Sequence, residues 1–315
     1  ILKLFYYKFT ETPLLKRMDL VRDYFIDEWE TLRGRNISDD DKLLLQQKFD
    51  KMYVTKDLYR IYCQLLEECG LDPLSGAEYE RRKIPYEDVF PMLYLKYRLE
   101  GGNHSHKNIK HLVIDEMQDY SYLQYEILGM LFSCPMTILG DKAQTMDTKI
   151  QDVTKFLPAI FGKDIRRIEM NKSYRNTEPI AAYAASLTGE TDAELFARDG
   201  DEVEVRNFFS REETLSFVAD AFSKEADTTE TASLLFLTEA EAKAAYRRLE
   251  KLFDEKGLSK EQLSYIDRNS NYFHTGLTVT TFYLAKGLEF ETVYAVTAKD
   301  RTDALTNQAR YIMAN

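Results

Sequence analysis

The chain has 315 residues, 44% of them hydrophobic and 30% charged, which suits a globular protein with enough length to bury a core in each of two domains. Its net charge of −11 argues against a generally basic nucleic-acid-binding surface, although a local groove stays open. The three cysteines form no Cys-x-x-Cys pair, which indicates reduced thiols in a cytoplasmic protein rather than a disulfide framework or a zinc site. No apolar run reaches the roughly 18–20 residues that span a bilayer, so we expect no membrane association.

Residues 1–100 are predicted to be largely helical, because leucine and aromatic residues recur there at spacings of three and four. Ser38 precedes three aspartates, which is typical of a helix start with acids in its first turn. The stripes indicate helices that pack on each other or on a sheet. A partner-binding arm remains an alternative role for this region.

The next segment has the pattern of a βαβ unit. The expected elements are a helix ending near residue 99, a strand over 110–114, a helix over 121–131 and a strand over 136–139. Polar residues follow both strands, as they do in parallel α/β units. A domain boundary is expected near residues 160–166.

The second half repeats this pattern and is predicted to form an independent α/β unit. Strands are expected at Ile168–Met170 and near 203–209, 232–237, 277–282 and 292–298. Helices are expected over about 177–187, 211–225, 239–255 and 302–314. The polar stretches 188–201 and 267–276 are predicted to be surface loops.

The most informative stretch is Leu112–Tyr120, in which an apolar run typical of a buried parallel strand is followed at once by acids. Asp115 and Glu116 come first, and Gln118 and Asp119 follow. Open α/β sheets bind ligands at the carboxyl ends of their strands. There, one acid can hold Mg²⁺ while its neighbour orients a water for attack on a phosphoryl group. A bare Asp-Glu pair is more often a solvated turn, but the residues that follow favour nucleotide hydrolysis.

Four segments occur in the order that superfamily 1A helicases of the UvrD/PcrA/Rep type show, and the chain resembles that family over residues 110–315. They match motifs II, III, IV and V and read Asp115-Glu116-Met117-Gln118-Asp119, Leu139-Gly140-Asp141-Lys142-Ala143-Gln144, Ser173-Tyr174-Arg175 and Ala285-Lys286-Gly287-Leu288-Glu289-Phe290. Any one of them alone is a weak signal, whereas the ordered set is specific. The stretch near residues 85–101 and the residues before Ala285 look most like the helicase-IV/HelD branch.

The resemblance assigns a role to each matching residue, with ATP and Mg²⁺ as cofactors. In the family's first domain, Asp115 corresponds to the Mg²⁺ ligand and Glu116 to the residue that positions the attacking water. Gln118 and Asp119 correspond to residues that support this site. Gln144 corresponds to the γ-phosphate sensor, and Asp141 to the residue that shapes the loop carrying Gln144. In the second, Tyr174 corresponds to the adenine stack, Arg175 to an arginine finger, Glu289 to the ribose contact and Gly287 to a close backbone approach. Thr281 and Lys286 lie where the family contacts the nucleic-acid backbone or couples to the phosphates.

Two departures from the family pattern bear on these roles. Tyr283 stands where the family usually has a histidine, which weakens the DNA contact there, although an aromatic ring can still stack on a base. No Gly-x-x-x-x-Gly-Lys-Ser/Thr motif occurs, and Arg310–Asn315 resembles the opening of motif VI. The sequence is therefore expected to be a fragment of a longer enzyme that lacks Walker A, and to be inactive by itself.

The resemblance implies an α/β fold with two RecA-like, P-loop-NTPase-type domains containing parallel sheets, plus the helical N-terminal region. Residues 1–100 are expected to be inserted in or to flank the first RecA-like domain, residues 101–165 to complete it, and residues 166–315 to form the second. The expected function is part of an ATP-dependent DNA helicase or translocase, acting on single-stranded or duplex DNA, with ATP hydrolysed between the two domains. The alternative is a HelD-like remodelling factor that binds RNA polymerase, with little unwinding. A catalytically dead interaction module is disfavoured, because such a module has no physical need for the intact acids and arginine.

Overall fold

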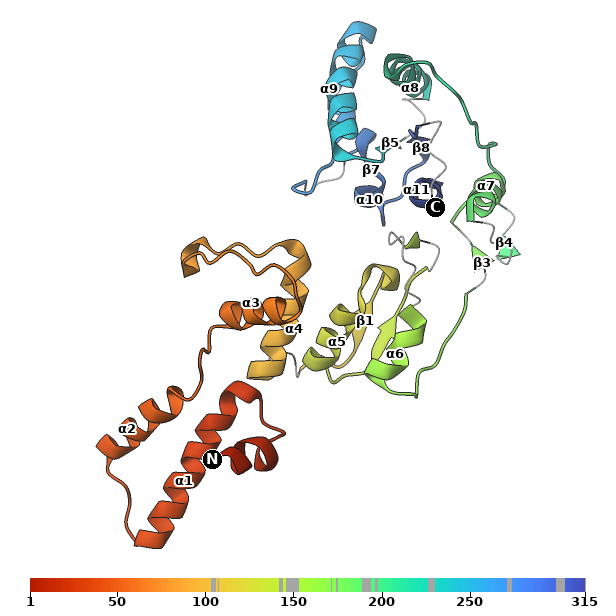
Figure 1. Cartoon of the computed structure of the whole chain (residues 1–315). Coiled ribbons are helices and arrows are strands. Elements are labelled where there is room, and N and C mark those ends of the chain that lie inside the picture. Colours follow the sequence, from red (N-terminus) through yellow and green to blue (C-terminus); the bar gives the residue numbers. More distant parts are fainter. Residues whose placement is uncertain are drawn as a thin grey trace. The chain divides into compact units, whose positions relative to one another are not determined.

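The computed structural model of the chain describes residues 1–102, 106, 108–141, 144–145, 153–170, 172–173, 175–188, 194–195, 198–225, 230–270, 274–298 and 304–314 (Figure 1). The chain divides into two compact units. The first comprises Ile1–Gly140 and Val153–Ile165, and the second comprises Asp141–Asp152 and Arg166–Asn315. All strand pairs in both units are parallel, so the mixed α/β fold with parallel sheets is confirmed. None of the described helices is long and apolar enough to cross a membrane.

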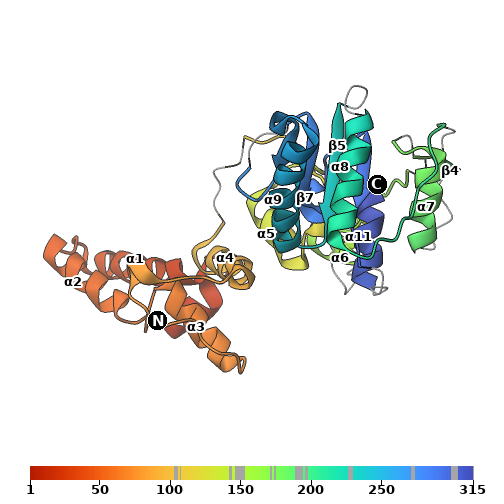
Figure 2. The same cartoon turned by 90° about the horizontal axis from the view of Figure 1, so that it is seen from above.

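The first hundred residues are helical, as predicted (Figure 2). The elements are the π-helical turn η1 (Leu4–Lys8), α1 (Leu14–Arg33), α2 (Asp39–Asp50), α3 (Leu58–Glu68), the 3₁₀ turn η2 (Tyr79–Arg81) and α4 (Tyr86–Glu100). The predicted helix start at Ser38 is confirmed, because its side chain accepts a hydrogen bond from the backbone N–H of Asp41 at 3.2 Å. Two small apolar clusters hold this region together, one around Val21 and Phe49 and one around Tyr59 and Tyr62.

The α/β part of the first unit is a two-stranded sheet of β1 (Leu112–Ile114) and β2 (Met136–Ile138) in the described residues. Helices α5 (Tyr122–Leu131) and α6 (Val153–Phe161) supply the buried residues that pack against it. The prediction that β1 is a buried strand is wrong in part, because Val113 is 60% exposed. Among the described residues, apolar helices pack on the face that carries Ile114, and Val113 on the other face is largely exposed.

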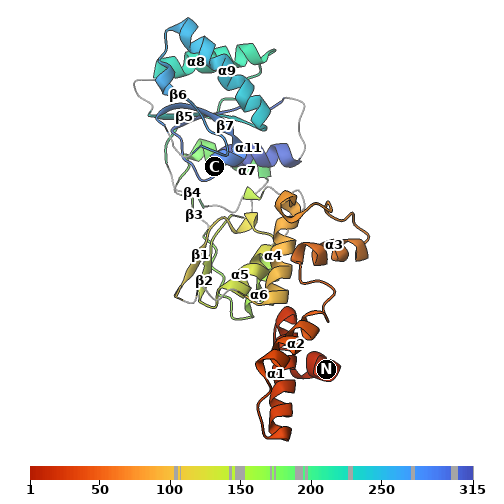
Figure 3. The same cartoon turned by 90° about the vertical axis from the view of Figure 1, so that its left-hand side faces the viewer.

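The second unit contains a four-stranded parallel sheet in the order β6-β7-β5-β8. Its strands are β5 (Thr231–Phe236), β6 (Leu263–Tyr265), β7 (Gly276–Thr281) and β8 (Thr292–Ala295). Figure 3 shows α8 (Arg211–Glu225) and α9 (Glu239–Lys256) on one side of this sheet and α11 (Ala304–Ala314) on the other. The alternation of side chains along β5 explains both layers: Leu234 packs in the cluster of α8 and α9, and Leu235 in that of the short α10 (Phe282–Ala285) and α11.

A smaller part of the second unit precedes this sheet. Here α7 (Glu178–Thr188) packs against α11, and β3 (Lys172–Ser173) pairs with β4 (Glu194–Leu195). The strand predicted at Ile168–Met170 is wrong, and so is the one predicted near residues 203–209. Ile168 is 68% exposed and Val205 is 71% exposed, so neither run has a packed face that would hold it in a sheet.

Candidate active site

The carboxyl end of β1 carries the acidic turn that the sequence singles out. Asp115 follows the strand, and its Oδ1 accepts a hydrogen bond from the backbone N–H of Glu116 at 2.8 Å. Glu116 has a φ angle of 53°, and it is the one non-glycine residue with positive φ in the described part of the chain. Left-handed backbone at a non-glycine residue costs roughly 1–3 kcal/mol and occurs preferentially at active sites and ligand clamps. The strain at Glu116 agrees with the prediction of a functional site at this turn.

Hydrogen bonds connect the residues of the acidic turn to one another. Gln118 donates from Nε2 to Oε2 of Glu116 at 2.5 Å, a charge-assisted hydrogen bond that fixes the orientation of the carboxylate. The next residues form the 3₁₀ turn η4 (Met117–Asp119), in which the N–H of Asp119 donates to the carbonyl of Glu116 at 2.9 Å. The structure thus groups the four predicted residues of this segment in one turn.

The end of β2 lies directly against the acidic turn. Leu139 receives a hydrogen bond at its carbonyl from the N–H of Met117 at 2.8 Å, which extends the pairing beyond the two strands. A Cβ atom on Gly140 would lie 2.4 Å from Oε1 of Gln118 and 2.6 Å from the backbone nitrogen of Met117. Only glycine fits there, so this residue sets the distance between the two strand ends.

Helix α5 contacts the acidic turn through a buried side chain. Ser121 and Gln124 form a reciprocal capping box that fixes the start of the helix. One turn later, the fully buried Tyr125 donates its hydroxyl to the carbonyl of Met117 at 3.0 Å. Burial raises the pKa of Tyr125, so the hydroxyl stays a neutral donor at every physiological pH. The acidic turn is therefore attached to the core of the first unit.

In the second unit, three predicted residues lie together. Gln144 donates from Nε2 to Oδ2 of Asp141 at 3.1 Å, and its own carbonyl accepts from Nζ of Lys286 at 3.4 Å. The hydroxyl of Tyr311 also reaches Oδ2 of Asp141, at 3.5 Å. The segment after β7 and helix α11 thus each contact one of the predicted residues Asp141 and Gln144.

Two further predicted residues form an ion pair. Nε of Arg175 lies 2.7 Å from Oε1 of Glu289, and the two side chains are 60% and 67% exposed. Solvent screens a pair this exposed, so it contributes little to stability. The backbone carbonyl of Arg175 accepts a hydrogen bond from Nη1 of Arg198 at 2.7 Å, which fixes the loop that carries it.

The segment from Thr281 to Gly287 connects β7 to this region. Thr281 is 1% exposed, and its Oγ1 has no hydrogen-bond partner among the described residues. Tyr283 donates its hydroxyl to Oε1 of Glu239 at 2.6 Å rather than contacting another predicted site residue. Gly287 has a φ angle of 81°, and a Cβ there would meet nothing within 4 Å in the described structure. The presence of glycine at this position is therefore explained by the backbone conformation and not by crowding.

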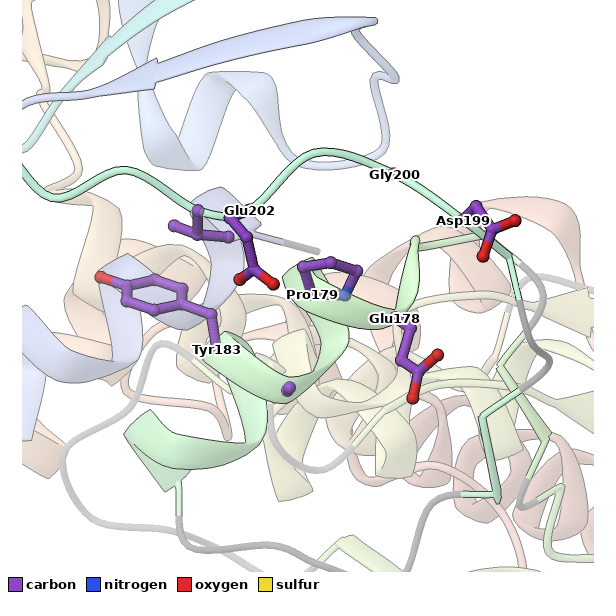
Figure 4. Close-up of a pocket in the computed structure, with 8 residues that line it drawn as sticks. Glu178, Pro179, Tyr183, Asp199, Gly200 and Glu202 are labelled. Atoms are coloured by element: carbon purple, nitrogen blue, oxygen red, sulfur yellow. The ribbon is translucent and has the colours of Figure 1, made fainter.

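A shallow hollow of about 520 Å³ lies between α7 and the segment 199–203 (Figure 4). Among the described residues, its lining includes three carboxylates, Glu178, Asp199 and Glu202, and no lysine or arginine. Negative charge disfavours a phosphate ligand there. None of the predicted site residues is among its lining residues, so it is not the candidate nucleotide site.

One predicted site residue is not described by the structure, and the structure adds contacts from residues that the sequence did not single out. Tyr174 lies outside the described residues. Glu239, Arg268 and Arg198 contact predicted residues or their neighbours but were missed. The signal for Glu239 is its place directly after a predicted strand, but the order of strands in the sheet is needed before it can be paired with Tyr283.

Comparisons with known proteins relate part of this chain to helicases. Residues 27–146 match the family model of the UvrD/REP helicase N-terminal domain. The ATP-dependent DNA helicase srs2 of Schizosaccharomyces pombe is 31% identical over 90 residues, which are 27% of this chain. The aligned part spans 10% of the length of that relative.

Proposed function

From the superfamily 1A, UvrD-like helicase assignment that these matches support, we propose that the chain is part of an ATP-dependent DNA helicase or translocase. In this proposal residues 1–100 are a helical insertion or flank of a first RecA-like domain that continues to residue 165. Residues 166–315 form a second RecA-like domain, and ATP hydrolysis drives movement along nucleic acid. The parallel sheets found in both units, with polar residues at the carboxyl ends of β1 and β7, support this architecture.

The acidic turn after β1 is the observation that carries the proposal. It combines a strained Glu116, a Gln118 amide that orients the carboxylate, and a glycine contact from the neighbouring strand end. A solvated loop has no need for any of these features. A turn that must hold a carboxylate in one orientation needs all of them, because catalytic groups act only within narrow geometry.

The donor set fits a magnesium ion bound together with a nucleotide. The described residues contain no group of three or more histidines, cysteines or acids that would hold a metal ion alone. Mg²⁺ in nucleotide hydrolases is held by one or two carboxylates and completes its shell with water and phosphate oxygens. Asp115 suits that role, and the ion with ATP would supply charge neutralisation on the phosphates.

The remaining roles follow from side-chain chemistry. Glu116 orients and deprotonates the attacking water, with Gln118 as the group that orients Glu116 and Asp119 as a further support of the turn. Arg175 stabilises negative charge on the transferred phosphoryl group, and its fork suits phosphate oxygens. Gln144, Asp141 and Lys286 form the linked phosphate-sensing group, with Gly287 giving their segment its turn. Tyr174 and Glu289 bind the adenine and ribose, and Thr281 and Tyr283 face nucleic acid.

Substitution Glu116→Gln tests the proposal in the whole protein. It keeps the shape and removes the base, so DNA-stimulated ATP turnover should fall by about 100-fold or more, while ATP affinity measured with a fluorescent analogue changes little. Glu67→Gln, on the surface of α3, makes the same chemical change far from the turn and should leave turnover unaltered. Wild-type turnover in Glu116→Gln would remove this residue from the reaction and the proposal with it.

A second candidate is a HelD-like factor that binds RNA polymerase and uses ATP to switch conformation. The observation that favours it is the Tyr283 hydroxyl, which is bonded to a carboxylate and is not free for a DNA phosphate. The large helical region and the net charge of −11 agree with it. Strand-displacement and polymerase-binding assays of the whole protein separate the two: polymerase binding without unwinding supports the second candidate.

A further inference from the structure

The carboxyl ends of β5 and β7 form a switch point in the four-stranded sheet. After β5 the chain passes to β6, on the far side of β7, and after β7 it passes to β8, on the far side of β5. The two connections therefore leave adjacent strands in opposite directions. In open parallel sheets, ligands bind in the crevice that this reversal creates. Figure 3 shows the strands β5, β6 and β7 side by side.

One side-chain network spans this switch point. Glu239 begins α9 just after β5, Tyr283 lies in α10 just after β7, and Arg268 follows β6. The hydroxyl of Tyr283 donates to Oε1 of Glu239 at 2.6 Å, and Nε of Arg268 donates to the same oxygen at 2.9 Å. Three neighbouring strands thus each place one group of the network at their carboxyl ends.

The electrostatics make Glu239 the centre of the network. The hydrogen bond from Tyr283, with the charge of Arg268 beside it, lowers the pKa of Glu239, so its carboxylate is ionised at neutral pH. Asp267 adds a second anion, and its pKa is lowered by the N–H of Asn269 and the hydroxyl of Ser270. The guanidinium of Arg268, although 74% exposed, is therefore engaged by a carboxylate within the protein.

We propose that Glu239 weakens nucleic-acid binding at this edge by withholding Arg268 from the phosphate backbone. The inference rests on the proposed binding of nucleic acid by the second unit. A phosphate that approaches Arg268 must displace a carboxylate already bonded to it, and it meets the charge of Glu239 while doing so. The buried Thr281, whose Oγ1 has no partner among the described residues, marks the same strand end as a place where a polar group is left for a ligand.

Substitution Glu239→Gln should release the arginine. We expect the 315-residue chain to bind a fluorescein-labelled oligothymidine about 5- to 10-fold more tightly at about 50 mM salt, because one further phosphate contact is gained. The slope of log affinity against log salt should steepen by about 0.7, the value for one contact with a single strand.

A double-mutant cycle with Arg268→Gln decides whether the released group is this arginine. By itself, Arg268→Gln should have little effect, and in the Glu239→Gln background it should abolish the gain. Glu261→Gln is the matched control: it removes the same charge from η6 (Lys260–Gln262), which precedes β6 and so lies at the opposite edge of the sheet. Thermal melts followed by circular dichroism confirm that each variant is folded.

Two results would overturn the inference: a gain in Glu239→Gln that matches Glu261→Gln, or a gain that survives Arg268→Gln. Either would show a general charge effect. If neither the wild-type chain nor Glu239→Gln binds the oligonucleotide, the inference is also wrong. These are equilibrium measurements without nucleotide, so they are independent of ATP turnover, which tests the proposed function separately.

Discussion

The two units contain parallel sheets of very different burial. In the second unit every residue of β7 is buried, and β5 is buried from its second residue onward. In the first unit β1 has one buried residue, Ile114, and its central Val113 is 60% exposed. Strands β1 and β7 each end in a segment that carries predicted site residues, so the predicted residues rest on two unlike supports.

The difference lies in what covers the sheets. Helices pack on both faces of β5, and the neighbouring residues Leu234 and Leu235 enter separate apolar clusters. In the part of the chain that the structure describes, β1 packs on one face, through Ile114 and Tyr125. The acidic turn is consequently held by individual contacts, such as the Tyr125 hydrogen bond and the Gly140 approach, whereas the segment after β7 is held by a core.

The core of the second unit should show the largest effect. Phe253 of α9 is fully buried and stacks on Phe222 of α8 with a centroid distance of 5.9 Å. Phe253→Ala should cost about 3–5 kcal/mol, because it removes the burial and leaves a cavity. Hydrogen–deuterium exchange of peptides from β5 and β7 measures the loss directly, since these strands lie under the removed ring.

Phe209→Ala is the control within the same unit, because that ring is fully exposed. It should change exchange in β5 and β7 by less than about 0.5 kcal/mol. Equal effects of the two alanines would show that the buried cluster does not stabilise the sheet, and the contrast between the two supports would lose its basis.

A valine in each sheet provides the next comparison. Val279 of β7 is fully buried, and Val113 of β1 is 60% exposed. Val279→Ala should cost about 2–3 kcal/mol, from two lost methyl groups and the space they leave, and Val113→Ala less than about 0.5 kcal/mol. Chemical denaturation of both variants, together with exchange of peptides from each strand, checks the values. A similar cost at both positions would mean that the open face of β1 is covered in solution.

The sequence predicted most elements where local signals agree. The strand over 110–114, the helix after Ser121 and the central strands near 232–237 and 277–282 were correct, because apolar runs ended at polar turns or caps. Helix α6 was not predicted, because it contains Pro158 and proline is a signal against a helix interior. The false strand at 168–170 shows the converse error: an apolar alternation without a partner forms no sheet.

The candidate site also has a part that local sequence signals predict and a part that depends on the order of strands. The acidic turn is contiguous in sequence, so Asp115, Glu116 and Gln118 could be grouped from the sequence, but the strain at Glu116 could not. The pairing of Tyr283 with Glu239 depends on β5 and β7 being neighbours. That order is decided by packing on two faces, for which the sequence carries no local signal.

Two glycines beside the predicted site residues, one in each unit, are required for different physical reasons. Gly140 is required by crowding, since a Cβ there would lie 2.6 Å from the backbone nitrogen of Met117. Gly287 has open space around it among the described residues but a φ angle of 81°. Gly140→Ala should therefore cost about 2 kcal/mol by overpacking, and Gly287→Ala about 1 kcal/mol by backbone strain.

Asparagine at the same two positions separates the causes, because it tolerates left-handed backbone better than alanine but is larger. Gly287→Asn should be more stable than Gly287→Ala by about 0.5 kcal/mol, whereas Gly140→Asn should be less stable than Gly140→Ala. Thermal melts rank the four variants, and exchange of peptides from residues 112–125 reports whether the acidic turn moves. The same rank order at both positions would contradict the argument, because it would mean that one physical cause governs both glycines. A reversal would establish that the first unit positions its acids by close contact between strand ends, and that the second needs only the turn itself.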